Sequence, residues 1–208
     1  MDLTRIIESR CSCRSFTDQA VTKEQLKELV RLAGLAPSVN NSQPWKFVAI
    51  VNTEMLKCMA DAVRAKLNNL IPDANDEVKQ TKNKVEWFST FFADAPAVIA
   101  VLSKPYEAVA DKALGVTHLT HQDINQMRGY PDIQSLGAAV QNILLAATDI
   151  GLGSCWLSGP LVAREELEKC LKAEEPWHLS AMVAIGYPKI DCKQQEKKSV
   201  DEIFEILA

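Results

Sequence analysis

Two arginines and a hydroxyl group lie within five residues near the N-terminus, in the stretch Arg10-Cys11-Ser12-Cys13-Arg14. A guanidinium group donates hydrogen bonds in a planar fork and a serine adds a small donor, a combination that suits a phosphate monoester dianion. The stretch follows a short apolar helical pattern at Leu3, Ile6 and Ile7. A solvated, charged helix end explains the same residues, and taken alone the pattern slightly favours that interpretation.

A polar loop between two prolines is the second candidate, with the sequence Ala36-Pro37-Ser38-Val39-Asn40-Asn41-Ser42-Gln43-Pro44-Trp45. Its amide and hydroxyl side chains can present donors and acceptors to a planar polar ring, and the prolines stiffen the loop. A turn that ends a helix and starts a strand explains the prolines and asparagines. That interpretation does not explain Gln43 and Trp45 in the same frame.

Three of the eight glycines fall in the stretch Gly151-Leu152-Gly153-Ser154-Cys155-Trp156-Leu157-Ser158-Gly159-Pro160. Clustered glycines indicate backbone brought close to a ligand or to another element. A nicotinamide-binding Rossmann fingerprint would need glycine at position 156, where the chain has Trp156. A helix C-cap at Gly151 is the simpler explanation for one of the three.

Other conventional sites are not supported by the sequence. His118 and His121 have no HExxH motif or third ligand beside them, which favours a solvent-facing or lid role over a metal site. Cys155 has no histidine nearby in sequence to activate it, so we expect an inert thiol. The pair Lys197-Lys198, taken alone, is a solvated charge pair.

The chain has six cysteines and no apolar signal segment at its N-terminus, so we expect thiols rather than disulfides. Cys11 and Cys13 form the only close pair in sequence. No second Cys or His pair stands at ligand spacing from them, and zinc needs about four ligands, so no metal site is predicted.

The elements that must position these residues alternate between helix and strand. A capping box at Thr22 and Gln25 begins an amphipathic helix that ends at Ala33, and helical patterns also cover residues 56–67 and, more weakly, 78–92. Short apolar runs at 47–51, 96–102 and 181–185 predict buried strands.

Three further segments need a setting in the fold. Residues 136–150 are apolar on nearly every face, which predicts a central helix or one in a subunit interface. Residues 199–208 pair a capping box at Ser199 and Glu202 with an apolar stripe that needs a surface to lie on. Residues 103–133 are polar and rich in turn residues, which predicts an irregular loop or lid.

Composition bounds the class of protein. The 208 residues carry a net charge of -4 and are 47% hydrophobic, as in an ordinary globular protein, and we expect a single domain. The acidic balance and the absence of a basic cluster argue against nucleic acid as a partner. The longest uncharged apolar run, 96–102, is too short to span a bilayer, so we expect no membrane association and a cytoplasmic location.

Four segments taken together resemble the FMN-dependent nitroreductase family. They are R-x-S-x-R at 10–14, A-P-S-x-x-N-x-Q-P-W at 36–45, Q-N-x-L-L-A-A-x-x-x-G-L-G at 141–153 and A-I-G-Y-P at 184–188. Each motif is weak by itself. The set in this order is specific, and it covers most of the chain.

The resemblance implies an α+β fold of three layers (α/β/α), with a central mixed sheet flanked by helices, in a domain-swapped homodimer. It implies one domain over residues 1–208, with a variable lid or insert at about 103–133 and a C-terminal dimer-wrapping arm at about 189–208. The apolar helix at 136–150 and the tail at 199–208 fit such a dimer, because each needs a surface that one subunit of this size lacks.

The resemblance also implies which residues bind FMN. The stretch 10–14 and the two lysines would bind the phosphate and ribityl chain. The polar loop would contact the ring edge, and the main chain at 157–159 would contact the flavin N5. The implied cofactor-binding residues are Arg10, Cys11, Ser12, Arg14, Pro37, Ser38, Val39, Asn41, Gln43, Leu157, Ser158, Gly159, Lys197 and Lys198. No catalytic side chain is implied, because the flavin carries the chemistry.

The implied activity is a ping-pong transfer of electrons from NADH or NADPH through FMN to a small acceptor such as a nitroaromatic or a quinone. Related proteins with this fold dehalogenate, fragment flavin or oxidise azolines, and a flavin-binding protein without turnover is the third possibility. One departure concerns the lysine that some members place before the second strand, because this chain has Phe88, Phe91 and Phe92 there.

Overall fold

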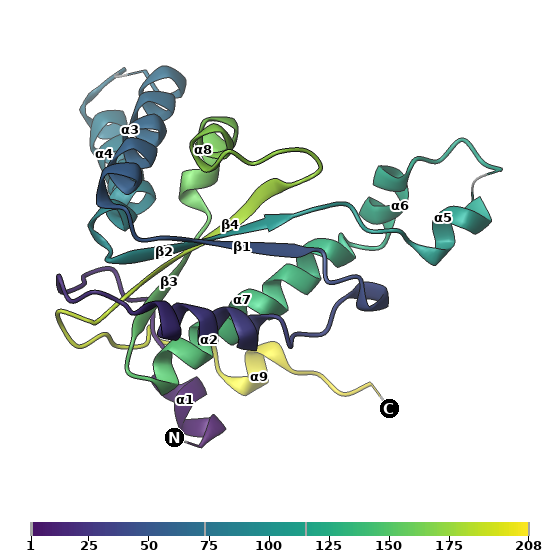
Figure 1. The fold of residues 1–208 in the computed structure, drawn as a ribbon, viewed down its shortest axis with the longest axis horizontal. Helices are drawn as coiled ribbons and strands as arrows, with labels where there is room; N and C mark the ends of the chain where they lie inside the picture. Colours follow the sequence, from purple (N-terminus) through teal and green to yellow (C-terminus); the bar gives the residue numbers. More distant parts are fainter. Residues whose placement is uncertain (1, 73, 115, 208) are drawn as a thin grey trace.

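The computed structural model describes residues 2–72, 74–114 and 116–207, so Gly115 in the expected lid and Ala208 at the end of the arm lie outside the described residues. Within these ranges the chain forms one antiparallel sheet in the order β1-β2-β4-β3. The strands are β1 (Trp45–Ile50), β2 (Ala97–Ser103), β3 (Gly153–Leu157) and β4 (His178–Gly186). Figure 1 shows the sheet edge-on at the centre of the molecule.

The expected mixed sheet differs from the sheet that is found. The three strand pairings of the described residues are antiparallel, and the parallel contact is an isolated bridge between Ser12 and Ser154. Three strands occupy the apolar runs that predicted them. The fourth, β3, lies inside the glycine-rich stretch, where close approach of another segment masks the strand pattern.

Helices cover both faces of the sheet, which confirms the expected α+β fold with three layers. In Figure 1, α3, α4 and α8 lie on one side, and α2 and α7 lie on the other. The longer helices are α2 (Lys23–Ala33), α3 (Thr53–Leu70), α4 (Asp76–Thr90), α7 (Pro131–Asp149) and α8 (Arg164–Leu171). The shorter ones are α1 (Leu3–Ser9), α5 (Val109–Leu114), α6 (His121–Met127) and α9 (Val200–Ile203), with 3-10 turns η1 (Val39–Asn41), η2 (Phe91–Asp94) and η3 (Gly159–Ala163).

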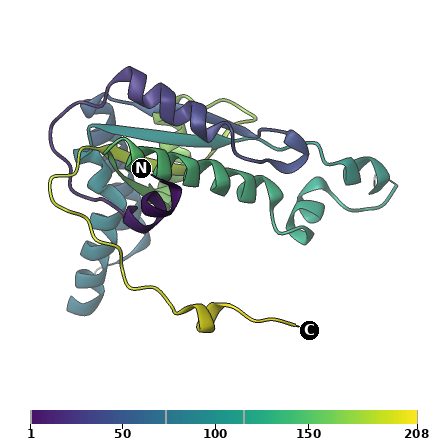
Figure 2. The same cartoon turned by 90° about the horizontal axis from the view of Figure 1, so that it is seen from below.

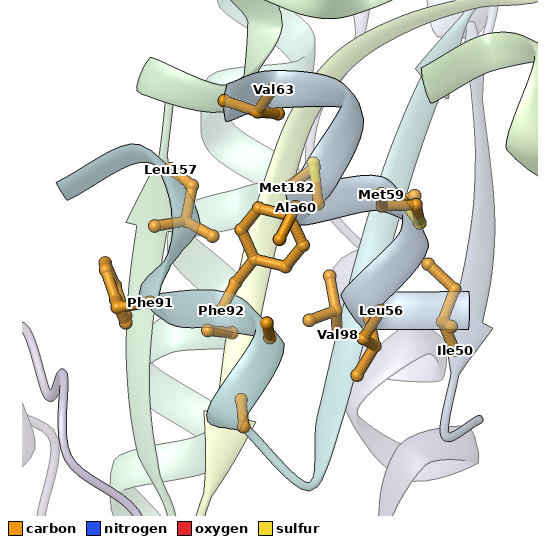
Figure 3. Packing of buried hydrophobic residues seen from close by; sticks show 14 of the residues in the cluster. Ile50, Leu56, Met59, Ala60, Val63, Phe91, Phe92, Val98, Leu157 and Met182 are labelled. Carbon is orange, nitrogen blue, oxygen red and sulfur yellow. The ribbon is translucent and has the colours of Figure 1, made fainter. Parts of the chain in front are cut away.

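The central strand β2 divides the apolar core into two clusters. Alternate side chains of a strand point to opposite faces, so Ala97, Ile99 and Val101 pack with α2 and α7. Val98 and Leu102 point the other way, into a cluster with α3 and η2. Figure 3 shows this second cluster, in which the ring of Phe92 lies between α3 and the sheet.

Several helix boundaries follow the sequence signals. Both oxygen acceptors of the capping box at Thr22 and Gln25 receive their hydrogen bonds at the start of α2. Helix α7 begins five residues before the apolar segment predicted at 136–150, because Pro131 occupies its first turn. The capping box at Ser199 and Glu202 also forms, but α9 ends after four residues.

The segment 103–133 contains more regular structure than the irregular loop that was expected. Helices α5 and α6 occupy it, and Thr120 with Asp123 caps α6 reciprocally. A hydrogen bond of 2.7 Å joins His121 Nδ1 to Asp111 Oδ2 and ties the two short helices together. Figure 1 shows them projecting from one end of the sheet.

The C-terminal residues run away from the body of the molecule. Figure 2 shows this yellow arm extended below the other elements, with α9 near its end. Its apolar side chains are exposed, including Phe204 at 61% and Leu207 at 90%. None of the helices within the described ranges has both the length and the hydropathy needed to cross a bilayer.

Phe92 is fully buried in the cluster of Figure 3. We expect Phe92→Ala to lower the free energy of unfolding by about 3–5 kcal/mol, because it removes buried apolar surface and leaves a cavity. Leu70→Ala, at a side chain that is 56% exposed at the end of α3, is the control and should change stability by less than about 1 kcal/mol. Urea unfolding followed by circular dichroism measures both, and equal losses would contradict the packing described.

Candidate functional site

The arginine stretch lies directly against β3. Ser12 and Ser154 form the parallel bridge, and the Cys13 amide donates to the Ser154 carbonyl at 3.0 Å. A methyl group on Gly153 would lie 2.8 Å from both Cβ and Sγ of Cys13 and 3.0 Å from Cγ of Pro188. Gly153 is therefore required for close backbone approach, as the glycine cluster indicated.

The two arginines of this stretch form no ion pair with an acidic side chain within the described part of the chain. Arg14 places its guanidinium 5.4 Å from the centre of the Phe88 ring, and its Nη1 donates to the Ser12 carbonyl at 3.4 Å. The positive charges of Arg14 and Arg10 both act to lower the pKa of Cys155 in β3. Their charge is available to an anion.

A cavity of about 400 Å³ opens beside Arg14 at the end of β3. Leu157, Ser158 and Gly159 line it, so the structure brings Arg14 of the arginine stretch and the 157–159 segment together. A methyl group on Gly159 would lie 2.6 Å from Ser89 Oγ. This glycine also marks a close approach, here between η3 and the C-terminal end of α4.

Helix α4 supplies cavity residues that sequence reasoning missed. They are Lys84, Val85, Phe88 and Ser89, together with Trp156 from β3. Residues 84, 85, 88 and 89 share one face because residues three and four apart in a helix are neighbours. This spacing is the signal that could have identified Lys84. Lys84 supplies a cation to the cavity from α4, although the positions where some family members place a lysine are aromatic in this chain.

Cys155 is the nucleophile candidate that the structure argues against. Burial raises the pKa of its thiol, and the opposing effects of Arg14, Ser12 and Arg10 are smaller. A thiol that stays protonated is a poor nucleophile. The expected inert role for Cys155 agrees with this environment.

The polar loop 37–43 has an unusual backbone. Asn40, Asn41 and Gln43 have φ of 50°, 49° and 45°, which is the left-handed region that side chains other than glycine seldom adopt. Ser38 Oγ accepts from the Gln43 amide at 3.0 Å, and the Val39 amide donates to Ser135 Oγ of α7. Strain of this kind collects at ligand sites.

A shallow cavity of about 300 Å³ adjoins this loop, lined by Pro37, Ser38 and Val39 and by the start of α7. It shares no residue with the cavity beside Arg14. The loop precedes β1 and the 157–159 segment follows β3, and these are the two edge strands of the sheet. Three strand spacings separate them, about 14 Å across the sheet. Within one chain the two sets of predicted residues are apart.

The C-terminal arm begins beside the arginine stretch. Gln194 Nε2 donates to the carbonyls of Arg10 and Ile7, at 3.0 and 2.9 Å. Lys197 and Lys198 follow three and four residues later, and both are exposed, without an ion pair among the described residues. The structure therefore brings the base of the arm to Arg10 while leaving the two lysines in solvent.

The expectation that every cysteine is a free thiol is wrong. Cys11 and Cys192 form a disulfide with their Cα atoms 5.9 Å apart, and Cys13, Cys58, Cys155 and Cys170 are free. The bonded residues are 181 positions apart in sequence. Spacing cannot reveal such a pair, because the fold of both chain ends creates it.

The two histidines of segment 103–133 differ in setting. His118 is exposed, whereas His121 contacts Asp111 and packs edge-on against Tyr106 at 5.2 Å between ring centres. The hydrogen bond from His121 lowers the pKa of Asp111. Across the described ranges, no group of three or more His, Cys, Asp or Glu side chains is placed to hold a metal ion.

Comparison with known proteins places the chain in one family. The family model described as "Nitroreductase family" matches residues 7–187. A "Putative NADH dehydrogenase/NAD(P)H nitroreductase" of Archaeoglobus fulgidus is 29% identical over 192 residues, covering 89% of this chain and 84% of that protein.

Two solved structures are similar over the full length of both chains. A BluB-like flavoprotein from Clostridium difficile 630 is 32% identical with a TM-score of 0.90. A nitroreductase with bound FMN from Desulfitobacterium hafniense DCB-2 is 22% identical with a TM-score of 0.74, a likeness that shows the fold.

Gly153→Ala tests the close approach on which the site is built. We expect a loss of about 1–3 kcal/mol in the free energy of unfolding, because the added methyl group must displace Cys13 or Pro188. Gly137→Ala is the matched control, since its methyl group would lie 3.7 Å from Trp156 Cη2, an ordinary contact. Chemical denaturation compares the two, and an unchanged stability for Gly153→Ala would refute the contact.

Proposed function

The chain belongs to the nitroreductase family, and from this premise we propose that it is an FMN-dependent oxidoreductase. It passes electrons from NADH or NADPH to a small acceptor such as a nitroaromatic compound or a quinone. The observation that carries the proposal is Arg14, which has no acidic partner among the described residues and lines the cavity at 157–159. The nicotinamide part is supported by the name of the Archaeoglobus fulgidus relative.

The donor set fits the phosphate end of FMN. Arg10 and Arg14 supply two guanidinium groups and Ser12 a hydroxyl, and a phosphate dianion is best held by fixed cations with small donors. Cys11 would contribute through its backbone, because its sulfur is bonded to Cys192. Lys197 and Lys198 add charge from the arm, within reach of Arg10 through Gln194.

The cavity fits the ring end. Phe88 and Trp156 give it an apolar rim and are 41% and 46% exposed, while Lys84 and the main chain at 157–159 supply polar groups. When bound, FMN supplies a ring that accepts a hydride from a reduced nicotinamide and passes electrons to the acceptor. The protein then needs to bind, orient and exclude water, and no side chain need act as general acid or nucleophile. Donor and acceptor use the same open face in turn.

The loop 37–43 completes this site only if a second chain supplies it. Within one chain it lies at the opposite sheet edge from Arg14. We therefore propose a homodimer with two equivalent FMN sites, in which Pro37, Ser38, Val39, Asn41 and Gln43 of one chain face the ring held by its partner. Three left-handed residues in this loop support a ligand role.

The arm at 189–208 supports the same assembly. Its exposed apolar residues Val200, Ile203, Phe204, Ile206 and Leu207 need a surface. Each chain offers one, an apolar groove of about 770 Å³ between α2 and the free edge of β1, lined by Val21, Leu26 and Phe47 among others. An unpaired strand edge beside a groove accepts an extended segment. The arm of one chain then wraps its partner, as the family resemblance implies.

A second candidate keeps the flavin and changes the chemistry. The solved structure with 32% identity is described as a BluB-like flavoprotein rather than a nitroreductase. Fragmentation or dehalogenation by a flavin would use the same anchor for the phosphate. A screen of products by mass spectrometry separates these reactions from simple electron transfer to an acceptor.

Purified protein should be yellow and should oxidise NADH or NADPH when a nitroaromatic or quinone acceptor is present. Arg14→Ala should weaken FMN binding by about 2 kcal/mol, because a charge-assisted contact is lost, which is roughly thirtyfold in Kd. Arg5→Ala, an exposed cation paired with Asp2 on α1, is the matched control and should bind FMN normally. Flavin fluorescence titration measures both.

Anaerobic addition of each nicotinamide to the FMN-loaded protein distinguishes the alternatives. Protein that binds FMN tightly but is not bleached anaerobically by either nicotinamide would favour a binding protein without turnover. A colourless protein with no affinity for added FMN would overturn the proposal in every form.

Phe204→Asp should convert the dimer into single chains, because it places a charge on the apolar side of the arm. Glu205→Gln, at the neighbouring exposed position, is the control and should leave the dimer intact. Light scattering after size-exclusion chromatography reports the mass. An unchanged mass for Phe204→Asp would exclude the arm as the dimer contact.

A further inference from the structure

The disulfide joins the arginine stretch to the arm that carries Lys197 and Lys198. Cys11 lies between Arg10 and Ser12 in the arginine stretch, and Cys192 lies in the arm, five residues before Lys197. The start of the arm is hydrogen-bonded to the N-terminal segment, because the Lys189 amide donates to the Ser15 carbonyl at 3.0 Å. The disulfide is therefore the covalent tie between the phosphate-facing stretch and the lysines.

Beyond Lys189, little else holds the arm within the described part of the chain. The hydrogen bonds to the body are the two that Gln194 Nε2 donates, to the carbonyls of Ile7 and Arg10, and they are exposed. Each such bond contributes about 1 kcal/mol net. Opening the disulfide would leave the position of the lysines to these bonds and to local packing.

The disulfide is also reachable from solvent. Both cysteines are half-buried and line a surface cavity of about 270 Å³. Arg10 and Lys193 flank them in sequence and place positive charge beside the sulfurs, while Asp191 adds a negative charge. Accessible disulfides are the ones that exchange readily with small thiols, whereas buried ones resist.

The geometry points to a reversible thiol–disulfide latch: we propose that the Cys11–Cys192 pair exchanges with low-molecular-weight thiols and disulfides and thereby sets how firmly the arm lysines and FMN are held. The effect on FMN rests on the function proposed above. In the closing reaction, the Cys11 and Cys192 thiols lose two electrons and two protons to form the S–S bond. One small disulfide is reduced and leaves as two small thiols.

The linked state keeps the two solvent-exposed lysines within reach of Arg10. Lys197 is three residues beyond Gln194, a span of about 11 Å at full extension, so a fixed Gln194 confines its ammonium group to the surroundings of Arg10. In the dithiol state the arm explores a larger volume, and the effective concentration of the lysines at the phosphate falls. Reduction should therefore weaken FMN binding by about tenfold.

The test compares protein equilibrated in oxidised glutathione with protein equilibrated in excess reduced glutathione. Three readouts are taken anaerobically: the number of alkylated cysteines by mass spectrometry, the Kd for FMN, and the rate of trypsin cleavage at Lys193 and Lys197. We expect two additional alkylated cysteines, weaker FMN binding and faster cleavage in the reduced sample.

Two variants separate this pair from other effects of glutathione. Cys192→Ser should behave like the reduced wild type under both conditions. The double variant Cys58→Ser, Cys170→Ser removes a second neighbouring pair, from α3 and α8, that is free in the structure. It should respond to glutathione as the wild type does.

The outcomes are distinct for the two proposals. No FMN binding in either redox state, with faster cleavage after reduction, defeats the proposed function and leaves the arm latch standing. Tight FMN binding with the same Kd and cleavage rate in both states defeats the latch and leaves the proposed function standing. Failure of Cys11 and Cys192 to re-form a bond in oxidised glutathione also defeats the latch.

Discussion

Gly153 has no side chain, and for that reason the backbone of Ser12 and Cys13 lies against β3. This contact determines where the arginine stretch points. Once Cys13 is fixed beside Ser154, Arg14 reaches Phe88 of α4 and the cavity at the end of β3. The same docking carries Cys11 and Arg10 to the base of the C-terminal arm. The absence of a side chain at Gly153 thus allows the arginine stretch to contact both α4 and the C-terminal arm.

Charge without a partner is the second constraint. Arg10 and Arg14 form no ion pair with a carboxylate among the described residues, so an anion or solvent must balance their charge. The arrangement is therefore better suited to binding than to stabilising the isolated fold. The left-handed backbone at Asn40, Asn41 and Gln43 is a similar case. Such conformations cost free energy in the isolated chain and are retained where they help to bind a ligand or a partner.

Much of the fold could be read from local pattern. The capping box at Thr22 and the apolar run of β2 act within a few residues, so their periodicity specifies the element directly. β3 escaped prediction because its one glycine, Gly153, makes room for a neighbouring segment rather than supporting the strand itself. The short helices α5 and α6 escaped because their stability comes from a cap and from the contact between His121 and Asp111, which apolar periodicity does not record.

The site was predictable only in part, for a different reason. The residues of 10–14 and 157–159 carry recognisable motifs, and the fold brings Arg14 of the first to the cavity lined by the second. Lys84 lies on a helix whose pattern is ordinary, and its role emerges only when α4 is placed beside β3. The link between Cys11 and Cys192 depends on both chain ends meeting, which is a property of the whole topology.

The burial of β2 on both faces has an evolutionary consequence. All seven of its residues are buried and six belong to one or other cluster, so a substitution at any of these six disturbs the core. The lid, the polar loop and the arm instead leave from the ends or edges of the sheet. Substitutions in these peripheral segments leave the sheet and its two apolar clusters unchanged. A lineage can therefore acquire new substrates without losing the stability of the fold.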